Sequence, residues 1–302
     1  MTGRDLPFLP ISPYSPEVNP ARLCILTLLA VMSFATNSLL CRFALKQTQI
    51  DAATFTSVRI FSGVAALWLV MKIRASPEVH LRKTGGNWSS AVALFVYTAA
   101  FSFAYVSLSA ATGALLLFGA VQATMIFWGL RKGERLRAIQ VMGLALALGG
   151  LVVLLFPGLS APPLGGSIVM LVAGIAWGVY SLRGRSEKDP VRATASNFLR
   201  AVPMAAALSI ILLPWARFDR AGITYAFLSG AITSGLAYIV WYTALPALKA
   251  ASAATVQLSV PVLAATGGIL LLGEPITLRY LLASIAVLGG IALFVFEKRQ
   301  TA

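Results

Sequence analysis

Two arginines lie inside long apolar stretches of this sequence, where a charge is costly. Arg59 follows "AATFTSV" and Arg200 follows "ATASNFL", 141 residues later. A guanidinium within a membrane must be paired or hydrated. Each arginine could therefore face a water-filled cavity and bind the carboxylate of a substrate with two parallel hydrogen bonds. The alternative is that each bonds backbone carbonyls, or extends to the membrane interface, and only fixes helix packing.

Aromatic side chains recur at helical spacing in three segments. They are Tyr97, Phe101 and Tyr105, then Trp177 and Tyr180, then Tyr238 and Tyr242. Residues three or four apart share one face of a helix, so these rings form stripes. The stripes could line a cavity for flat or apolar molecules. They could also be ordinary helix packing, or a belt of aromatic residues at the membrane interface.

Side-chain amides are rare in the apolar segments. The candidates for a binding site are Asn37, Gln122 and Gln257. An amide is costly against lipid, so each is expected to face the protein interior. There it would either bind a substrate or hydrogen-bond a neighbouring helix.

Groups that catalyse reactions are missing from the middle of the apolar segments. All ten acidic residues lie in tails, loops or segment ends, and the one histidine, His80, lies between two segments. Cys24 and Cys41 match no metal-binding spacing, and no phosphate-binding loop occurs. We predict no enzymatic activity, no metal and no cofactor. Without a carboxylate at mid-membrane for a cationic drug and a proton, the sequence favours a facilitator.

Ten apolar segments make up most of the chain. The sequence is 58% hydrophobic and 11% charged, whereas soluble proteins are about 25% charged. A membrane span needs about 20 mainly apolar residues. Segments of this kind cover residues 22–42, 53–73, 89–108, 111–130, 136–156, 165–184, 193–213, 223–243, 252–272 and 277–296. The predicted fold class is an all-α integral membrane protein with ten transmembrane helices in the lipid bilayer.

The basic residues predict how the chain is oriented. With a cytoplasmic N-terminus, 17 Lys and Arg fall on the cytoplasmic side and five on the other. Because positive residues gather in cytoplasmic loops, both termini are predicted to be cytoplasmic, in the inner membrane. The same bias explains the net charge of +14 without binding of nucleic acid. Residues 1–20 hold five prolines and no apolar run, which predicts a flexible cytoplasmic tail.

The two halves of the chain resemble each other. "GLALALGGLVVLLF" at 143–156 and "ASIAVLGGIALFVF" at 283–296 lie 140 residues apart, and each follows a Gly-Glu pair. Five spans fit in each half, and five is odd, so the second half would cross the membrane upside down. This is the inverted-repeat plan of many transporters. We therefore expect one five-helix repeat at 21–156 and a second, inverted one at 157–302.

Short motifs at matching places point to a known family. A first motif, Tyr105-Val106-Ser107-Leu108, corresponds to Tyr242-Thr243-Ala244-Leu245 in the second half. A second motif, Gly133-Glu134-Arg135-Leu136, corresponds to Gly273-Glu274-Pro275-Ile276. Arg59 corresponds to Arg200. With ten spans, these residues resemble the EamA-type branch of the drug/metabolite transporter superfamily over residues 22–297. The halves also differ, because the place in the first half that matches Pro261 holds Val121-Gln122.

The resemblance implies a function as well as a fold. Members of this branch with a similar shape export amino acids, aromatic ones included. We expect a monomeric exporter or facilitator that works by alternating access around a central cavity between the halves. The open alternatives are export of other small metabolites or drugs on the same fold, and an integral-membrane enzyme.

Overall fold

The computed structural model describes residues 20–74, 85–131, 137–155, 161–185, 187, 189–248, 256–257 and 259–297. Two expectations fall outside these residues: the Gly133-Glu134 motif and the tail predicted at 1–20, of which only Pro20 is described, as the first residue of α1. The described residues form helices joined by short connections, with no β-strand among them.

Among the described residues, the first half contributes five helices and the second half seven helical segments, apart from two short 3₁₀ turns. The first five are α1 (Pro20–Gln47), α2 (Ala52–Ile73), α3 (Trp88–Tyr105), α4 (Ala110–Arg131) and α5 (Ala138–Leu155). Then come α6 (Leu164–Gly184), α7 (Pro190–Ile211), α8 (Arg220–Gly230), the π-helical η3 (Ala231–Leu236) and α9 (Ala237–Ala244). The chain ends with α11 (Ser259–Leu272) and α12 (Leu278–Glu297), and short 3₁₀ turns η2 (Leu213–Trp215) and η4 (Leu245–Ala247) follow α7 and α9.

Most of these helices are suited to a membrane. Seven described helical stretches are long and apolar enough to cross one: Ala21–Gln47, Ala52–Ile73, Trp88–Tyr105, Ala110–Arg131, Leu164–Gly184, Pro190–Ile211 and Arg220–Ala244. Three shorter apolar helices accompany them: Ala138–Leu154, Ser259–Leu272 and Leu278–Leu293. The all-helical membrane fold is therefore confirmed, and the count of ten spans stays a prediction.

Polar side chains fix where several helices begin. Asp51, Asn87, Asp189 and Asp219 each accept a hydrogen bond from a backbone N–H in the first turn of the helix that follows. Such N-caps satisfy donors that would otherwise lack a partner. The connections between apolar segments thus contain the residues that end one helix and start the next.

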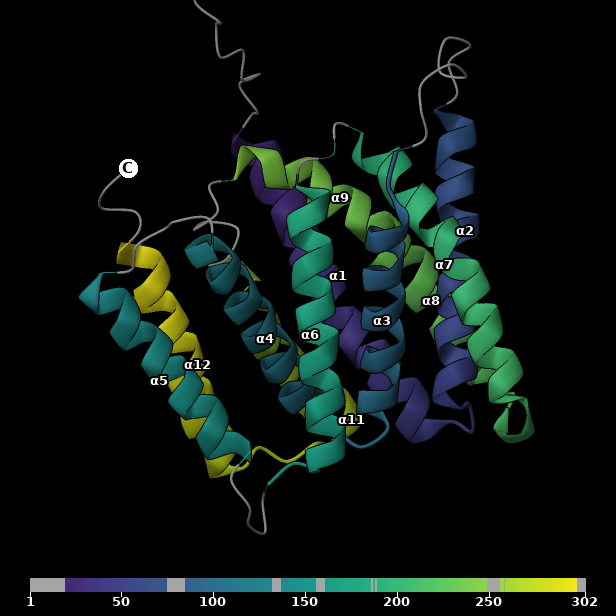
Figure 1. The fold of residues 1–302 in the computed structure, drawn as a ribbon. Coiled ribbons are helices and arrows are strands. Elements are labelled where there is room, and N and C mark those ends of the chain that lie inside the picture. The colour runs from purple at the N-terminus through teal and green to yellow at the C-terminus, as the bar shows by residue number, and fades with distance from the viewer. Residues whose placement is uncertain are drawn as a thin grey trace, which may run out of the picture.

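The helices pack in a pattern that is nearly unchanged when the halves are exchanged. α5 packs on α12, α2 on α7 and α4 on α11. The contacts of α1 with α9 and α11 have counterparts in those of α6 with α3 and α4. Figure 1 shows α5 and α12 together at one side of the bundle and α2 with α7 at the other.

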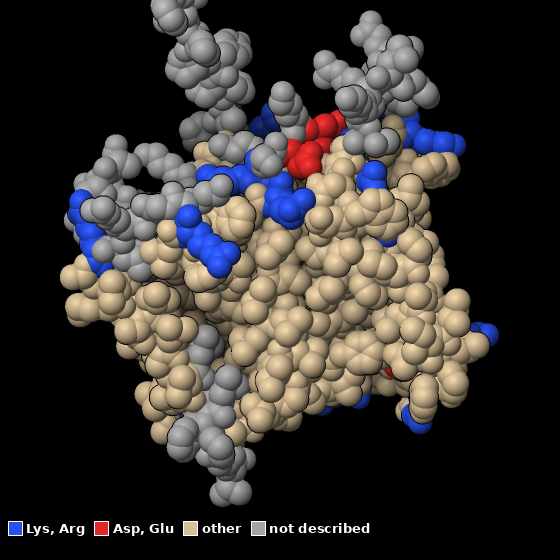
Figure 2. Space-filling model, viewed as in Figure 1, with Lys and Arg blue, Asp and Glu red and all other residues tan. Residues whose placement is uncertain are grey.

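The two ends of the bundle differ in charge. We call the end at which α1 begins and α12 ends the upper end, and the opposite one the lower end, as in Figure 1. Figure 2 shows blue Lys and Arg side chains gathered along the upper end, above a broad uncharged band on the visible face. A band of this kind suits the hydrocarbon interior of a bilayer.

The first helix is longer than expected. We predicted that it would end near residue 42, with Arg42 and Lys46 in an external connection. Instead α1 continues to Gln47 and carries both residues in its last turns. The physical reason is that both find partners within the bundle, on Glu274 and on backbone carbonyls.

Candidate functional site

Arg59 lies at the centre of the bundle and is almost fully buried, with 1% of its surface exposed. It projects from α2 toward both α3 and the α8–α9 segment. Nε donates a hydrogen bond to Ser234 Oγ at 3.0 Å, and Nη2 donates to the hydroxyl oxygens of Tyr97 at 3.1 Å and Tyr238 at 3.3 Å. Nη1 is also buried, and no described residue accepts a hydrogen bond from it. Arg59 therefore does not extend to the interface, contrary to one of the two interpretations above.

Aromatic faces complete the surroundings of this guanidinium. Cζ of Arg59 lies 4.9 Å from the ring centre of Phe101 and 5.2 Å from that of Tyr97. A cation over an aromatic face is attracted by the ring's electron density, more strongly where water is excluded. The rings therefore lower part of the cost of burying the charge.

The groups around Arg59 come in pairs that match between the halves. The correspondence of Tyr105 with Tyr242, 137 residues apart, makes Tyr97 the counterpart of Ser234 and Phe101 the counterpart of Tyr238. Arg59 contacts all four residues of these two pairs: Tyr97 and Ser234, and Phe101 and Tyr238. It therefore sits where equivalent faces of the two halves meet.

Asn37 on α1 forms the second polar centre of the site. Its Nδ2 donates to Tyr97 Oη at 3.4 Å, and its Oδ1 accepts hydrogen bonds from the hydroxyls of Ser229 at 2.7 Å and Thr233 at 3.1 Å. Tyr97 is thus shared by Asn37 and Arg59. Both amide ends of Asn37 are engaged within the protein.

A cluster of aromatic side chains surrounds these polar groups. The aromatic cluster consists of Phe34, Tyr97, Phe101, Tyr105, Trp177, Tyr180, Phe198, Tyr238, Trp241 and Tyr242. Trp177 is central, with its ring centre 4.9 Å from Tyr97 and 4.8 Å from Tyr238. All ten side chains are buried, so Tyr105 and Tyr242 are not interface residues exposed to water.

The backbone of the α8–α9 segment places two of these polar partners. Ser234 and Thr233 lie in the π-helical η3, and π-helical turns are frequent at functional sites. The approach to α2 is close, because a Cβ atom on Gly230 would lie 2.0 Å from the backbone oxygen of Arg59. A glycine at position 230 therefore allows Ser234 to reach the guanidinium.

Three predicted site residues lie apart from this centre. Arg200 bonds Ser196 on its own helix, through the hydroxyl and the backbone oxygen. Gln122 lines a small cavity of about 20 Å³ with residues of α5 and α12. Gln257 is buried, and among the described residues neither glutamine is bonded to Arg59 or Asn37. The structure thus brings together Asn37, Arg59, Tyr97, Phe101, Trp177, Tyr180, Tyr238 and Tyr242.

Sequence reasoning missed several members of the site. Ser229, Thr233 and Ser234 were not singled out, because hydroxyl residues are common in apolar helices. Phe34 was not among the predicted site residues either. The correspondence of Tyr105 with Tyr242, applied to Tyr97, points to Ser234 and was the available signal.

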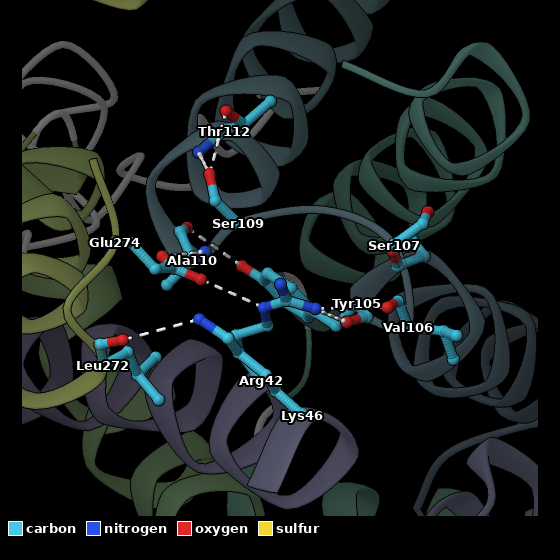
Figure 3. A network of polar contacts seen from close by, with 11 residues as sticks. Arg42, Lys46, Tyr105, Val106, Ser107, Ser109, Ala110, Thr112, Leu272 and Glu274 are labelled. Atoms are coloured by element: carbon cyan, nitrogen blue, oxygen red, sulfur yellow. Dashed lines mark hydrogen bonds and ion pairs between the residues drawn. The ribbon is translucent and has the colours of Figure 1, made fainter. Parts of the chain in front are cut away.

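A second network closes the lower end of the bundle. Figure 3 shows Arg42 of α1 directed at Glu274, in the connection between α11 and α12. Arg42 Nε lies 3.0 Å from Glu274 Oε1, and its Nη1 donates to the backbone oxygens of Tyr105 and Val106. Glu274 Oε2 accepts a hydrogen bond from the backbone N–H of Ala110 at 2.8 Å. This ion pair therefore ties α1 and the α11–α12 connection to the end of α3 and the start of α4.

A hollow adjoins this network. It has a volume of about 270 Å³ and is lined by Arg42, Lys46, Glu274, Pro163 and Tyr280, among others. Lys46 Nζ also donates to the backbone oxygen of Leu272. The ion pair thus separates the lower surface from the aromatic cluster, which begins at Tyr105.

Polar contacts also join helices at the upper end. Arg183 of α6 donates from Nε to Ser90 Oγ and from Nη2 to Asn87 Oδ1. The backbone N–H of Asn87 donates to Asn197 Oδ1 of α7. These contacts join α6 and α7 to the start of α3.

Comparisons with known proteins identify the family. EamA-like transporter family sequences match the chain at residues 21–156 and again at 164–296. An uncharacterized protein of Pseudomonas aeruginosa is 57% identical over 272 residues, 90% of this chain and 94% of that protein. The uncharacterized transporter YoaV of Bacillus subtilis is 22% identical over 264 residues, 83% of this chain and 90% of that one. The crystal structure of another protein has a similar fold, with a TM-score of 0.64 at 18% sequence identity. The match covers 93% of this chain and 100% of that one. The chain belongs to the EamA-like transporter family, multi-pass membrane proteins that transport small molecules.

Proposed function

We propose that this transporter carries amino acids, aromatic ones included, across the bacterial inner membrane by alternating access. The observation that carries the proposal is Arg59 Nη1, a buried donor without a partner at the centre of the bundle. A carboxylate is the natural acceptor for it, because guanidinium and carboxylate form strong, charge-assisted hydrogen bonds. The aromatic cluster around it would receive an aromatic or apolar side chain.

The proposed motion follows from the likeness of the halves. The family match falls once on each half of the chain, and helix packing is nearly the same when the halves are exchanged. In an inverted repeat, one half takes the arrangement of the other, and the site between them changes the side to which it opens. We propose ten spans in two repeats, 21–156 and 157–302, acting as a monomer.

The ion pair between Arg42 and Glu274 would be the closure on the external side. This assignment uses the positive-inside bias, which puts the upper end and both termini in the cytoplasm. Opening to the outside would require the ion pair to break and the end of α3 to move from α1. The upper contacts of Arg183 would break in the opposite state.

The site suggests a facilitator. Among the described residues, no carboxylate is bonded to Arg59 or Asn37, so no group there takes up a proton in exchange for a substrate. Net flux would then follow the gradient of the substrate itself.

Uptake by purified protein in sealed liposomes tests the function. We expect saturable uptake of labelled phenylalanine without an imposed ion or pH gradient, inhibited by other amino acids and not by cationic dyes. Protein-free liposomes give the background. Uptake of cations alone, driven by a pH gradient, would rule out the amino-acid assignment and favour drug export on the same fold.

A further inference from the structure

Within the part of the chain that the structure describes, the groups that bond the charge of Arg59 are all neutral. Its Nε and Nη2 donate to the hydroxyls of Ser234, Tyr97 and Tyr238, and Nη1 donates to nothing. Hydroxyls and ring faces stabilise a cation but do not neutralise it. The centre of the transporter therefore carries a net positive charge in the state described.

Acidic side chains lie away from this centre. Of the residues the structure describes, Glu274 is the buried acidic one, and Arg42 and Ala110 engage it at the lower end. Glu187 lines a small hollow with Tyr180 at the upper end. The described aspartates, Asp51, Asp189 and Asp219, cap helices at the ends of the bundle. None of them bonds Arg59.

Neutral acceptors near Arg59 are already engaged. Asn37 Oδ1 accepts two hydrogen bonds, from Ser229 and Thr233. Tyr97 Oη is contacted by donors from Asn37 and Arg59. An ammonium group has three donors and no acceptor. A ligand ammonium would thus find both of these oxygens occupied. The other acceptors at Arg59, the hydroxyls of Ser234 and Tyr238, already bond the guanidinium that would repel it.

A zwitterionic amino acid therefore suits this site less well than a simple anion. A bound carboxylate would compensate Arg59, but the ammonium on the next carbon would lie close to the same guanidinium. Two like charges at that distance repel appreciably where water is excluded. A hydroxyl in place of the ammonium removes this repulsion and keeps the shape.

We infer that the Arg59 site recognises the carboxylate of its ligand and not an α-ammonium, so that aryl carboxylates of charge −1 are better ligands than the matching amino acids. This inference rests on the proposed function, since it concerns the same site. Amines that lack a carboxylate are excluded. The aromatic cluster accepts the aryl group in both kinds of ligand.

Binding of three matched ligands tests the inference. The full chain in lipid nanodiscs is titrated by calorimetry with phenylalanine, with 3-phenyllactate, in which a hydroxyl replaces the ammonium, and with phenylalaninamide, which keeps the ammonium and lacks the carboxylate. We expect 3-phenyllactate to bind at least about tenfold more tightly than phenylalanine. Phenylalaninamide should bind at least about tenfold more weakly than phenylalanine, because it cannot compensate Arg59.

Variants assign the preference to Arg59. Arg59→Gln should abolish the advantage of 3-phenyllactate, and Arg200→Gln, its counterpart in the repeat, should retain it. The unfolding temperature of each variant shows whether it is folded. If Arg59→Gln does not fold, the order of the three ligands' affinities for the unaltered protein tests the inference by itself.

Each other outcome contradicts the inference in a distinct way. If phenylalanine binds and 3-phenyllactate binds equally or more weakly, the ammonium is recognised, and amino-acid transport stands without the inference. Tight binding of phenylalaninamide would show that ring faces hold the ammonium. If none of the three binds and phenylalanine is not taken up by liposomes, the proposed function fails together with the inference.

Discussion

Tyr97 and Ser234 bind the same guanidinium group, that of Arg59, from matching places in the two halves of the chain. Neither half could provide this arrangement alone. The polar centre is therefore a property of the interface between the halves, which is where an inverted-repeat transporter binds its substrate. Movement of the halves relative to each other would change the contacts of Arg59 first.

The closure at the lower end should depend on the charge of Glu274. Glu274→Gln keeps the shape and removes the charge that Arg42 pairs with, and breaking a buried ion pair is costly. We expect the lower end to open more often. Cys41, buried on α1 one residue before Arg42, then becomes accessible to a membrane-impermeant thiol reagent. In a Cys24→Ala background, its labelling should accelerate at least about tenfold.

Asp219→Asn is the matched control for this experiment. Asp219 lies at the same end and caps α8, and asparagine caps a helix equally well. Labelling of Cys41 should stay slow in this variant. Equal labelling in the Glu274→Gln variant and the unaltered protein would show that the ion pair does not keep the lower end closed.

Gly230 should tolerate no side chain. A Cβ atom there would lie 2.0 Å from the Arg59 backbone oxygen and 2.0 Å from Ser62 Oγ. Gly230→Ala should therefore push α8 away from α2 and cost about 1–3 kcal/mol, measured as a lower unfolding temperature. Gly149→Ala is the control, because nothing lies within 4 Å of a Cβ at that position. An alanine there should stabilise its helix by up to about 1 kcal/mol. Equal unfolding temperatures for the two variants would contradict the close crossing.

Asp51 should make stability depend on pH. Burial raises the pKa of Asp51, but hydrogen bonds from the Arg217 backbone N–H, the Thr54 hydroxyl and the N–H groups of Thr54 and Ala53 outweigh it and lower the pKa. A carboxylate whose pKa is lowered by folding adds stability above its unfolded pKa of about 3.9. That contribution is lost as the pH falls through the lower, folded value.

Comparison with Asp51→Asn isolates this contribution. At pH 7 the unaltered protein should unfold at a higher temperature than the variant. The difference should shrink as the pH is lowered below about 4. A difference that stays constant between pH 7 and pH 3 would mean that the charge of Asp51 does not stabilise the fold.

Most helices were predictable from sequence because they are long apolar runs, several of which begin at a polar cap. The residues at which the helices end were less predictable, as α1 shows. Arg42 and Lys46 are charged and follow the apolar run, and such residues usually lie in loops. They remain helical because Glu274, 232 positions away, is the partner of Arg42, and the backbone oxygen of Leu272 is the partner of Lys46. A contact between such distant residues leaves no local signal in the sequence.

The sequence predicted which kinds of side chain form the candidate site, but not which of the candidate residues lie together. Arg59 and Arg200 lie at matching places in the two halves, each within an apolar segment, and tertiary packing distinguishes them. Arg59 meets both halves, whereas Arg200 bonds Ser196 on its own helix. Gln122 and Gln257 were chosen because an amide in an apolar segment is expected to face the protein interior, and packing places Gln122 beside α5 and α12.

Uptake of labelled phenylalanine by Arg59→Gln and Arg200→Gln, side by side in liposomes, tests the central claim most directly. Both variants lose one arginine from matching helices, so only the location of the charge differs. The account predicts that Arg59→Gln loses at least about 99% of uptake, as expected for a lost charge-assisted bond to the substrate, while Arg200→Gln keeps most of it. Equal uptake by the two folded variants would contradict the claim that Arg59 binds the substrate.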